Sequence, residues 1–198
     1  ARSPGSFDGR VNLNSDGRRP VVLRGTYGWS NDKSGASGRN IDFGVSARFR
    51  ETLQLSIGPS YSRSQTTAQY VTRVSDPLAS DTYGSRYVFA NLDRTTVSLD
   101  TRVDVTLSPA LSLQIYLEPF ISVGDYESFK EFRAPNTYDF LEYGVDAGTI
   151  APNGSGGFDV DPDGSGAAPS FSLSDRDFSV GSLIGNAVLR WEGRQITP

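Results

Sequence analysis

The sequence predicts an all-β fold, an antiparallel up-and-down meander of long strands of the outer-membrane β-barrel type. Three observations predict it. Residues 96–123 alternate between apolar and polar side chains in two runs joined by a tight turn. Each run is longer than the usual strand of a soluble protein, which has about 5–6 residues. The connections between successive strands alternate between short and long.

The two runs at 96–123 have the period of two that a β-hairpin requires, because successive strand side chains point to opposite faces. One face carries apolar residues around a turn at Ser108-Pro109-Ala110: Val97, Leu99, Thr101, Val103, Val105, Leu107, then Leu111, Leu113, Ile115, Leu117, Pro119, Ile121 and Val123. The other face carries polar and ionised residues. About 9–11 tilted residues cross the hydrocarbon of a bilayer. This pattern is typical of a membrane strand with its apolar face outward and its polar face inward.

Composition limits the function. The 198 residues could form a single domain or a barrel fragment, residues 1–198 together. The absence of Cys and His excludes thiol nucleophiles, Cys/His zinc sites, imidazole bases and disulfides. A net charge of −4 argues against nucleic acid as a partner. There is no run of about 18 apolar residues that would form a transmembrane helix. Residues 1–6 are expected to be a flexible lead-in, so an exported chain would be a mature or excised product.

The first half of the chain holds four alternating segments. Phe7–Asn14 is a short one, and Val21–Ser30 is the first convincing strand. Asn40–Arg50 and Leu53–Ser62 follow, joined by a tight turn at residues 50–52. Pro59 cannot donate to a ladder and marks a strand end, an edge or a bulge. We expect Tyr27, Trp29 and, near the other end of the chain, Trp191 to be aromatic residues at a membrane interface. For Trp29 the alternative is an ordinary packed aromatic.

The remaining segments complete the pattern. Residues 63–86 are expected to form a protruding loop or hairpin, and residues 87–92 lead into the central hairpin. Residues 124–177 are the longest irregular region, before a last strand at Phe178–Glu192. The long loops 31–38, 63–86 and 124–177 therefore lie on one side, opposite the short turns. Short periplasmic turns and long extracellular loops characterise outer-membrane barrels. A soluble β-sandwich is the alternative, but nothing would sort its loops in this way.

The polar strand faces carry charges of both signs. They would face the lumen of a barrel: Arg24, Asp42, Arg48, Arg50, Asp100, Arg102, Asp104 and Glu118. Such a wall could bias the passage of ions. The alternative is a ladder of cross-strand ion pairs that only satisfies the interior, and the near balance of charge favours that alternative.

One loop has a weak resemblance to a calcium site. Asp159, Asp161 and Asp163 alternate before Gly164, as oxygen ligands do at the start of a calcium loop. Ser170 stands at the twelfth position, where a bidentate Glu is expected. Calcium is the one cofactor that the sequence suggests, and the alternative is an acidic, solvated turn.

No catalytic arrangement emerges from the sequence, so a non-enzymatic protein is predicted. Ser residues have no His to activate them. The glycine-rich stretches do not follow a strand and open a helix, as phosphate-binding loops do. The alternative is a surface hydrolase that uses loop carboxylates.

Several stretches resemble a family of large bacterial surface proteins of unknown function, which join a carbohydrate-binding-like N-terminal sandwich to a C-terminal membrane barrel. The similar stretches are residues 87–99, 111–126, 129–132, 138–140, 143–144 and 186–192, within 10–192. The resemblance implies an outer-membrane location and a didermal, Gram-negative source. The loop lengths and the apolar strand faces add the expectation of extracellular loops and of lipid as a partner. It implies no activity. The carbohydrate-binding part is absent here, and the sequence stops at Gln195–Pro198 without a further strand and terminal aromatic.

The predicted function is therefore a barrel segment of a bacterial outer-membrane surface protein that serves as an anchor or a pore. Six strong strands are expected, whereas single-chain bacterial barrels have at least about eight. Either further sequence of a parent chain completes the barrel, or copies of this chain pair edge to edge. The alternative function is a self-assembling extracellular β-rich fibre or tube.

Overall fold

The structure, a computed structural model, describes residues 4–192. Residues 1–3 of the expected lead-in and the C-terminal stretch Gln195–Pro198 lie outside the described residues. The all-β prediction is confirmed. The elements are β1 (Ser6–Asn14), β2 (Val21–Asp32), β3 (Ser37–Phe49), β4 (Leu53–Ser75), the 3₁₀ turn η1 (Ser80–Thr82), β5 (Ser85–Ser108), β6 (Leu111–Phe132), β7 (Phe140–Glu142), β8 (Thr149–Pro152), β9 (Phe158–Asp161), β10 (Phe171–Leu173) and β11 (Phe178–Trp191).

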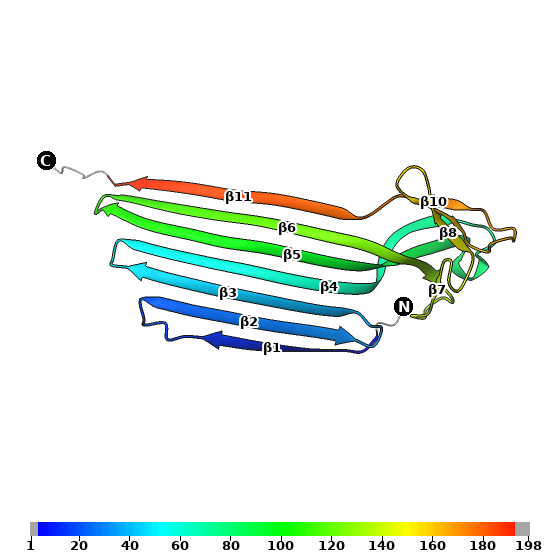
Figure 1. The fold of residues 1–198 in the computed structure, drawn as a ribbon, viewed down its shortest axis with the longest axis horizontal. Coiled ribbons are helices and arrows are strands. Elements are labelled where there is room, and N and C mark those ends of the chain that lie inside the picture. The colour runs from blue at the N-terminus through cyan, green and yellow to red at the C-terminus, as the bar shows by residue number, and fades with distance from the viewer. Residues whose placement is uncertain (1–3, 193–198) are drawn as a thin grey trace.

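The long strands form one antiparallel sheet in the order β1-β2-β3-β4-β5-β6-β11, and β7 adds to β6 (Figure 1). The antiparallel meander is confirmed, but a closed barrel is not formed within the described residues. The sheet is open, with β1 and β11 as its edge strands. Both edge strands run in the same direction, away from the end of the molecule that holds β8, β9 and β10 (Figure 1). They therefore cannot pair with each other in the antiparallel manner used everywhere else in this sheet.

Several strands are longer than the sequence predicts. The segment at 7–14, expected to be short, pairs with β2 along its whole length. Of residues 31–38 only 33–36 form a turn, because β2 runs to Asp32 and β3 begins at Ser37. Much of 63–86 is strand, and the first part of 124–177 belongs to β6. The polar and glycine-rich composition suggested loops. Pairing with a neighbouring strand satisfies the backbone groups here and favours the ladder.

The register merges the separate strand patterns into two continuous faces. One transverse row is fully apolar across six strands: Val11, Tyr27, Ile41, Tyr61, Val97 and Ile121. Because the side-chain period is two, a single matched row places all other apolar positions of these strands on the same side. We call this side the outer face and the opposite side the inner face.

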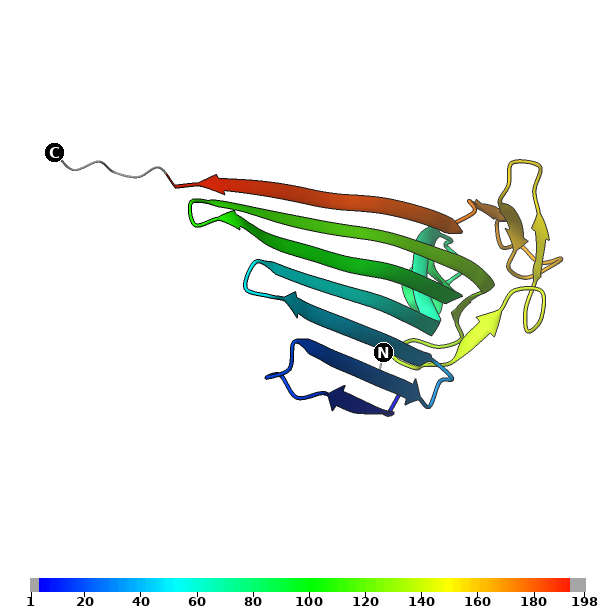
Figure 2. The same cartoon turned by 60° about the vertical axis from the view of Figure 1, so that its left-hand side comes forward.

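The far ends of β4, β5 and β6 are bent and carry a compact head, which comprises residues 66–92 and 125–177. The bends coincide with shifts of register at Thr66/Gln69 and Tyr70/Thr72 in β4 and near Phe89 in β5. Such bulges bend strands and increase their twist. The sheet β10-β9-β8 lies in this head, beyond the ends of the long strands (Figure 2).

The buried hydrophobic cluster lies in the head and not along the long strands. Its members are Val71, Val88, Ala90, Phe129, Tyr143, Val160 and Leu173. The strands between residues 95 and 123 thus lead to a head that has its own core, while their own apolar side chains remain partly or widely exposed. Among residues 4–192, no helix is long and apolar enough to cross a membrane.

Candidate functional site

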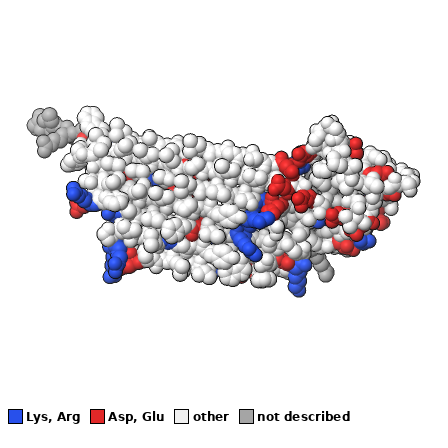
Figure 3. All heavy atoms as spheres, in the orientation of Figure 1, with Lys and Arg blue, Asp and Glu red and all other residues white. Residues whose placement is uncertain are grey.

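The outer face forms an apolar band, defined here by the outward side chains between Trp29 at one end and Trp191 at the other. Its large side chains are widely exposed, with Ile121 58%, Val97 50% and Phe43 46% accessible. Figure 3 shows a largely uncharged surface between charged groups toward both ends. A monomer in water rarely exposes an apolar surface that covers most of one face. The band is therefore the candidate functional surface.

The height of the band matches a bilayer. From Val97 to Leu107 the strand advances by ten residues, or about 33 Å at about 3.3 Å per residue. A strand tilted by about 40° converts this length to about 25 Å, the height of the apolar belt on membrane barrels.

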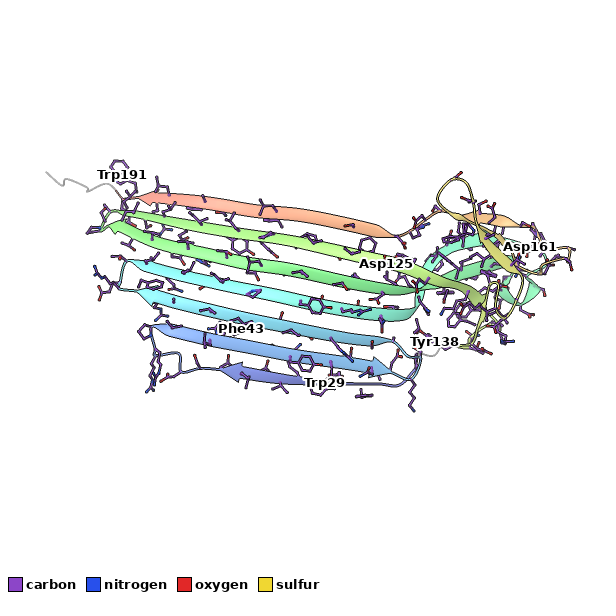
Figure 4. All side chains as sticks on the ribbon, in the orientation of Figure 1. Trp29, Phe43, Asp125, Tyr138, Asp161 and Trp191 are labelled. Atoms are coloured by element: carbon purple, nitrogen blue, oxygen red, sulfur yellow. The ribbon has the colours of Figure 1, made fainter. Side chains whose placement is uncertain are left out.

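Aromatic residues lie at both ends of the band. The rings of Tyr27 and Trp29 stack at 5.6 Å. Trp191, 76% exposed, lies at the opposite end of the sheet from Trp29 (Figure 4). Arg63, in the same transverse row as Trp29, donates from Nε to Asp93 Oδ1, in the next outer row toward the head, at 3.0 Å. The order of side chains from apolar to aromatic to ionised is that of a membrane interface.

The indole ring of Trp29 packs over Gly9 of the edge strand β1, which has no side chain and so leaves room for the ring. The two residues are paired in the register, and a Cβ on Gly9 would overlap the indole ring. Packing of a large ring over a strand glycine supplies the contact that the glycine lacks.

We expect Gly9→Val to displace Trp29 from the edge strand. The single-tryptophan background Trp191→Phe isolates the fluorescence of Trp29, whose emission should then change in wavelength and polarisation. Gly25→Val is the matched control on the outer face, because its Cβ would meet only Leu13 at 3.9 Å. An unchanged Trp29 signal in the Gly9 variant would contradict the contact.

The inner face gathers most of the predicted lumen-facing charges. The register places Arg24, Asp42, Arg48, Asp100, Arg102, Asp104 and Glu118 on this side. Arg50 is the exception, and its predicted place on this face is wrong. It lies in the turn between β3 and β4 with a φ of 59°, so its backbone leaves the strand and it does not belong to the wall.

Neutral and charged polar groups share the hydrogen bonds of the inner face. Ser60 donates to Asp42 at 2.6 Å, and the hydroxyls of Thr96 and Ser122 bond across β5 and β6 at 2.9 Å. Of the predicted charges, only Arg102 and Asp104 form an ion pair in the part of the chain described, at 3.1 Å and on the same strand. The expected ladder of cross-strand ion pairs is therefore not what the structure contains.

The head holds a buried charge cluster that sequence reasoning missed. Arg86 donates to Asp76 at 2.6 Å and also bonds Glu131. Asp76 is fully buried. Burial raises the pKa of Glu131 despite the opposing charge of Arg86. Burial likewise raises the pKa of Tyr143, whose hydroxyl lies beside this cluster. Asp76-Pro77 resembled a solvated loop, and only the fold shows that the loop closes over Arg86.

The three carboxylates of the suggested calcium loop have separate partners. Asp159 accepts a hydrogen bond from the Ser172 hydroxyl at 2.7 Å. Asp161 accepts from the amide of Gly164 at 2.9 Å, and Asp163 from the amide of Ala168 at 2.9 Å. The backbone bond from Ala168 holds the pKa of Asp163 below its usual value. Within residues 4–192 no group of three or more metal-ligating side chains is found, so calcium binding stays a prediction.

Comparison of the chain with protein-family models, with curated protein sequences and with solved structures finds no match. The family resemblance drawn from the sequence therefore stays a prediction. The structure defines the class of the protein as an open, antiparallel β-meander with one apolar face, one polar face and a compact head at one end.

Proposed function

We propose that this chain is a membrane-spanning β-sheet segment of a bacterial outer-membrane surface protein. The apolar band lies against hydrocarbon, the inner face lies against water, and the head is extracellular. The protein is non-catalytic and serves as an anchor or as part of a pore wall. The observation that carries this proposal is the bilayer-sized band of exposed apolar side chains, with tryptophan and then ionised residues at its ends.

The energetics favour lipid as the partner of the band. Each apolar square ångström removed from water contributes about 25 cal/mol, so exposure of the whole band to water would be strongly unfavourable. The inner face, which carries Arg24, Asp42, Asp100 and further ionisable strand residues, would be costly in hydrocarbon, because a charged side chain at bilayer depth needs water or a partner. The two faces together fit a sheet with lipid on one side and water on the other.

The first test is sedimentation of the native chain with and without detergent, followed by negative-stain imaging. Discrete particles that stay soluble only in detergent are the expected result, since micelles replace lipid on the band. Regular filaments or tubes in plain buffer would contradict the proposal, because the apolar faces would then be contacts between subunits.

The two tryptophans allow a test of depth in lipid vesicles. We expect the fluorescence of Trp29 and of Trp191 to be quenched more by lipids brominated near the headgroup than by lipids brominated near the chain end. Both residues lie at the ends of the band, where amphipathic rings prefer the interface. Each is measured alone in Trp191→Phe and Trp29→Phe. Equal quenching at all depths, or none, would exclude a spanning orientation.

A second candidate function is a self-assembling extracellular fibre or tube. The observation that favours it is the pair of edge strands, β1 and β11, of which β11 is apolar on both sides: Leu183 and Leu189 are exposed on the outer face, and Ile184 and Val188 on the inner face. Unprotected edges of this kind favour pairing with another chain. The detergent experiment above separates the two candidates.

A further inference from the structure

The inner face contains a hollow that results from two glycines side by side. Arg24 on β2 pairs with Gly44 on β3, and Gly58 on β4 pairs with Asp100 on β5. The pairs Asp42–Ser60 and Val45–Ile57 place Gly44 beside Gly58. Because neither glycine has a side chain, the floor between Arg24 and Asp100 is bare. The hollow measures about 160 Å³ and is also lined by Arg102 and Tyr116.

Opposite charges stand on the two sides of this floor. Arg24 lies on one side, and Asp100 lies on the other with Glu118 beside it on β6. Three strand intervals of about 4.8 Å separate the Cα atoms of Arg24 and Asp100, or about 14 Å. In the described part of the chain none of these three residues forms an ion pair. One residue that carries a guanidinium and two residues that carry carboxylates therefore lie on opposite sides of the bare floor.

The acidic side retains capacity for a cation. The Tyr116 hydroxyl lies 3.1 Å from Asp100 Oδ1 and 2.6 Å from Glu118 Oε2. A hydroxyl has one proton and can donate to only one of the two carboxylates at a time. The other carboxylate is left without that donor, and both keep free lone pairs and their negative charge. A positively charged N–H group in the hollow could bond to both.

We propose that this hollow binds a small zwitterion such as an α-amino acid. Its carboxylate lies against Arg24, whose planar fork of donors suits a carboxylate. Its ammonium group lies against Asp100 and Glu118. The inference rests on the proposed function in one respect, because the inner face must be open to water. A neutral or singly charged solute would leave one side of the hollow without a counter-charge.

The test is calorimetric titration of the detergent-solubilised full chain with glycine, and separately with methylammonium and with acetate. Glycine is expected to bind at least about tenfold more tightly than either single-charge probe, a difference of about 1.4 kcal/mol, because only glycine gains charge-assisted hydrogen bonds on both sides of the hollow. Arg24→Gln and Asp100→Asn are each expected to weaken glycine binding by about tenfold or more.

A steric variant tests the hollow without removing a charge. Gly58→Val should abolish glycine binding by filling the floor, and a Cβ at this position meets Asp100 Cβ at an ordinary 3.6 Å. Gln114→Val is the control, since it lies on the same face outside the hollow and should bind like the wild type. Far-UV circular dichroism checks that both variants keep their β-structure.

Two outcomes overturn the inference. One is binding of methylammonium as tight as glycine and unaffected by Arg24→Gln, which would indicate a site for cations only. The other is a detergent-dependent protein that binds none of the three probes. A chain that forms filaments without detergent would instead overturn the proposed function, so the two failures are distinguishable.

Discussion

Ile57→Arg is expected to lower the free energy of unfolding from lipid vesicles by about 2–4 kcal/mol, the cost of an arginine at the lipid-facing midplane of a barrel. Ile57 belongs to the middle row of the apolar band, between Val45 and Thr101. In the proposed membrane orientation, a guanidinium at this depth has neither water nor a partner within the band. The measurement is urea unfolding in vesicles, monitored by tryptophan fluorescence.

Its neighbour Ser56 supplies the matched control. Ser56 points to the inner face, where its hydroxyl bonds Ser46 at 3.0 Å and where Arg102 is opposite in the register. Ser56→Arg should cost much less, about 1 kcal/mol, because the new charge remains in water after one hydrogen bond is lost. Equal losses for the two variants would mean that lipid does not contact the outer face.

Arg86→Met is expected to destabilise the head by about 3–5 kcal/mol, because removal of one partner from a buried ionic cluster leaves uncompensated charge. Asp76 and Glu131 would then face each other without a cation in a site where Asp76 is fully buried. The readout is amide hydrogen exchange of head residues, which reports local opening. Arg133→Met is the control, since its ion pair with Asp139 is about half exposed and should contribute about 0–1 kcal/mol.

Lowering the pH should reduce the loss of head stability caused by Arg86→Met. Burial raises the pKa of Glu131 in the folded protein above its unfolded value. A carboxyl group with a raised folded pKa favours the folded state below its unfolded pKa, and this contribution is lost as the pH rises through the folded pKa. Without Arg86 the folded pKa rises further, so protonation relieves the unpaired charge. If the stability loss of Arg86→Met stays constant from neutral pH down to about 4, the ionised Glu131 carboxylate is not its cause.

The sequence by itself determined the central parts of the long strands and their two faces. The unbroken alternation from Val97 to Leu107 specifies which side chains share a side, because backbone pleating fixes that period. It also placed most inner-face charges correctly, including Arg24, Asp100 and Glu118. The error at Arg50 arose at a turn, where a positive φ ends the alternation and the pattern alone gives no boundary.

Only the tertiary structure decided which strands are neighbours and what their pairing creates. Arg24 and Asp100 are distant in sequence, and the row that joins them through Gly44 and Gly58 depends on register. The buried Asp76–Arg86–Glu131 cluster likewise depends on how the ends of β4, β5 and β6 fold together. Local periodicity records the direction of each side chain, whereas the partner across a sheet is set by long-range pairing that no short stretch of sequence contains.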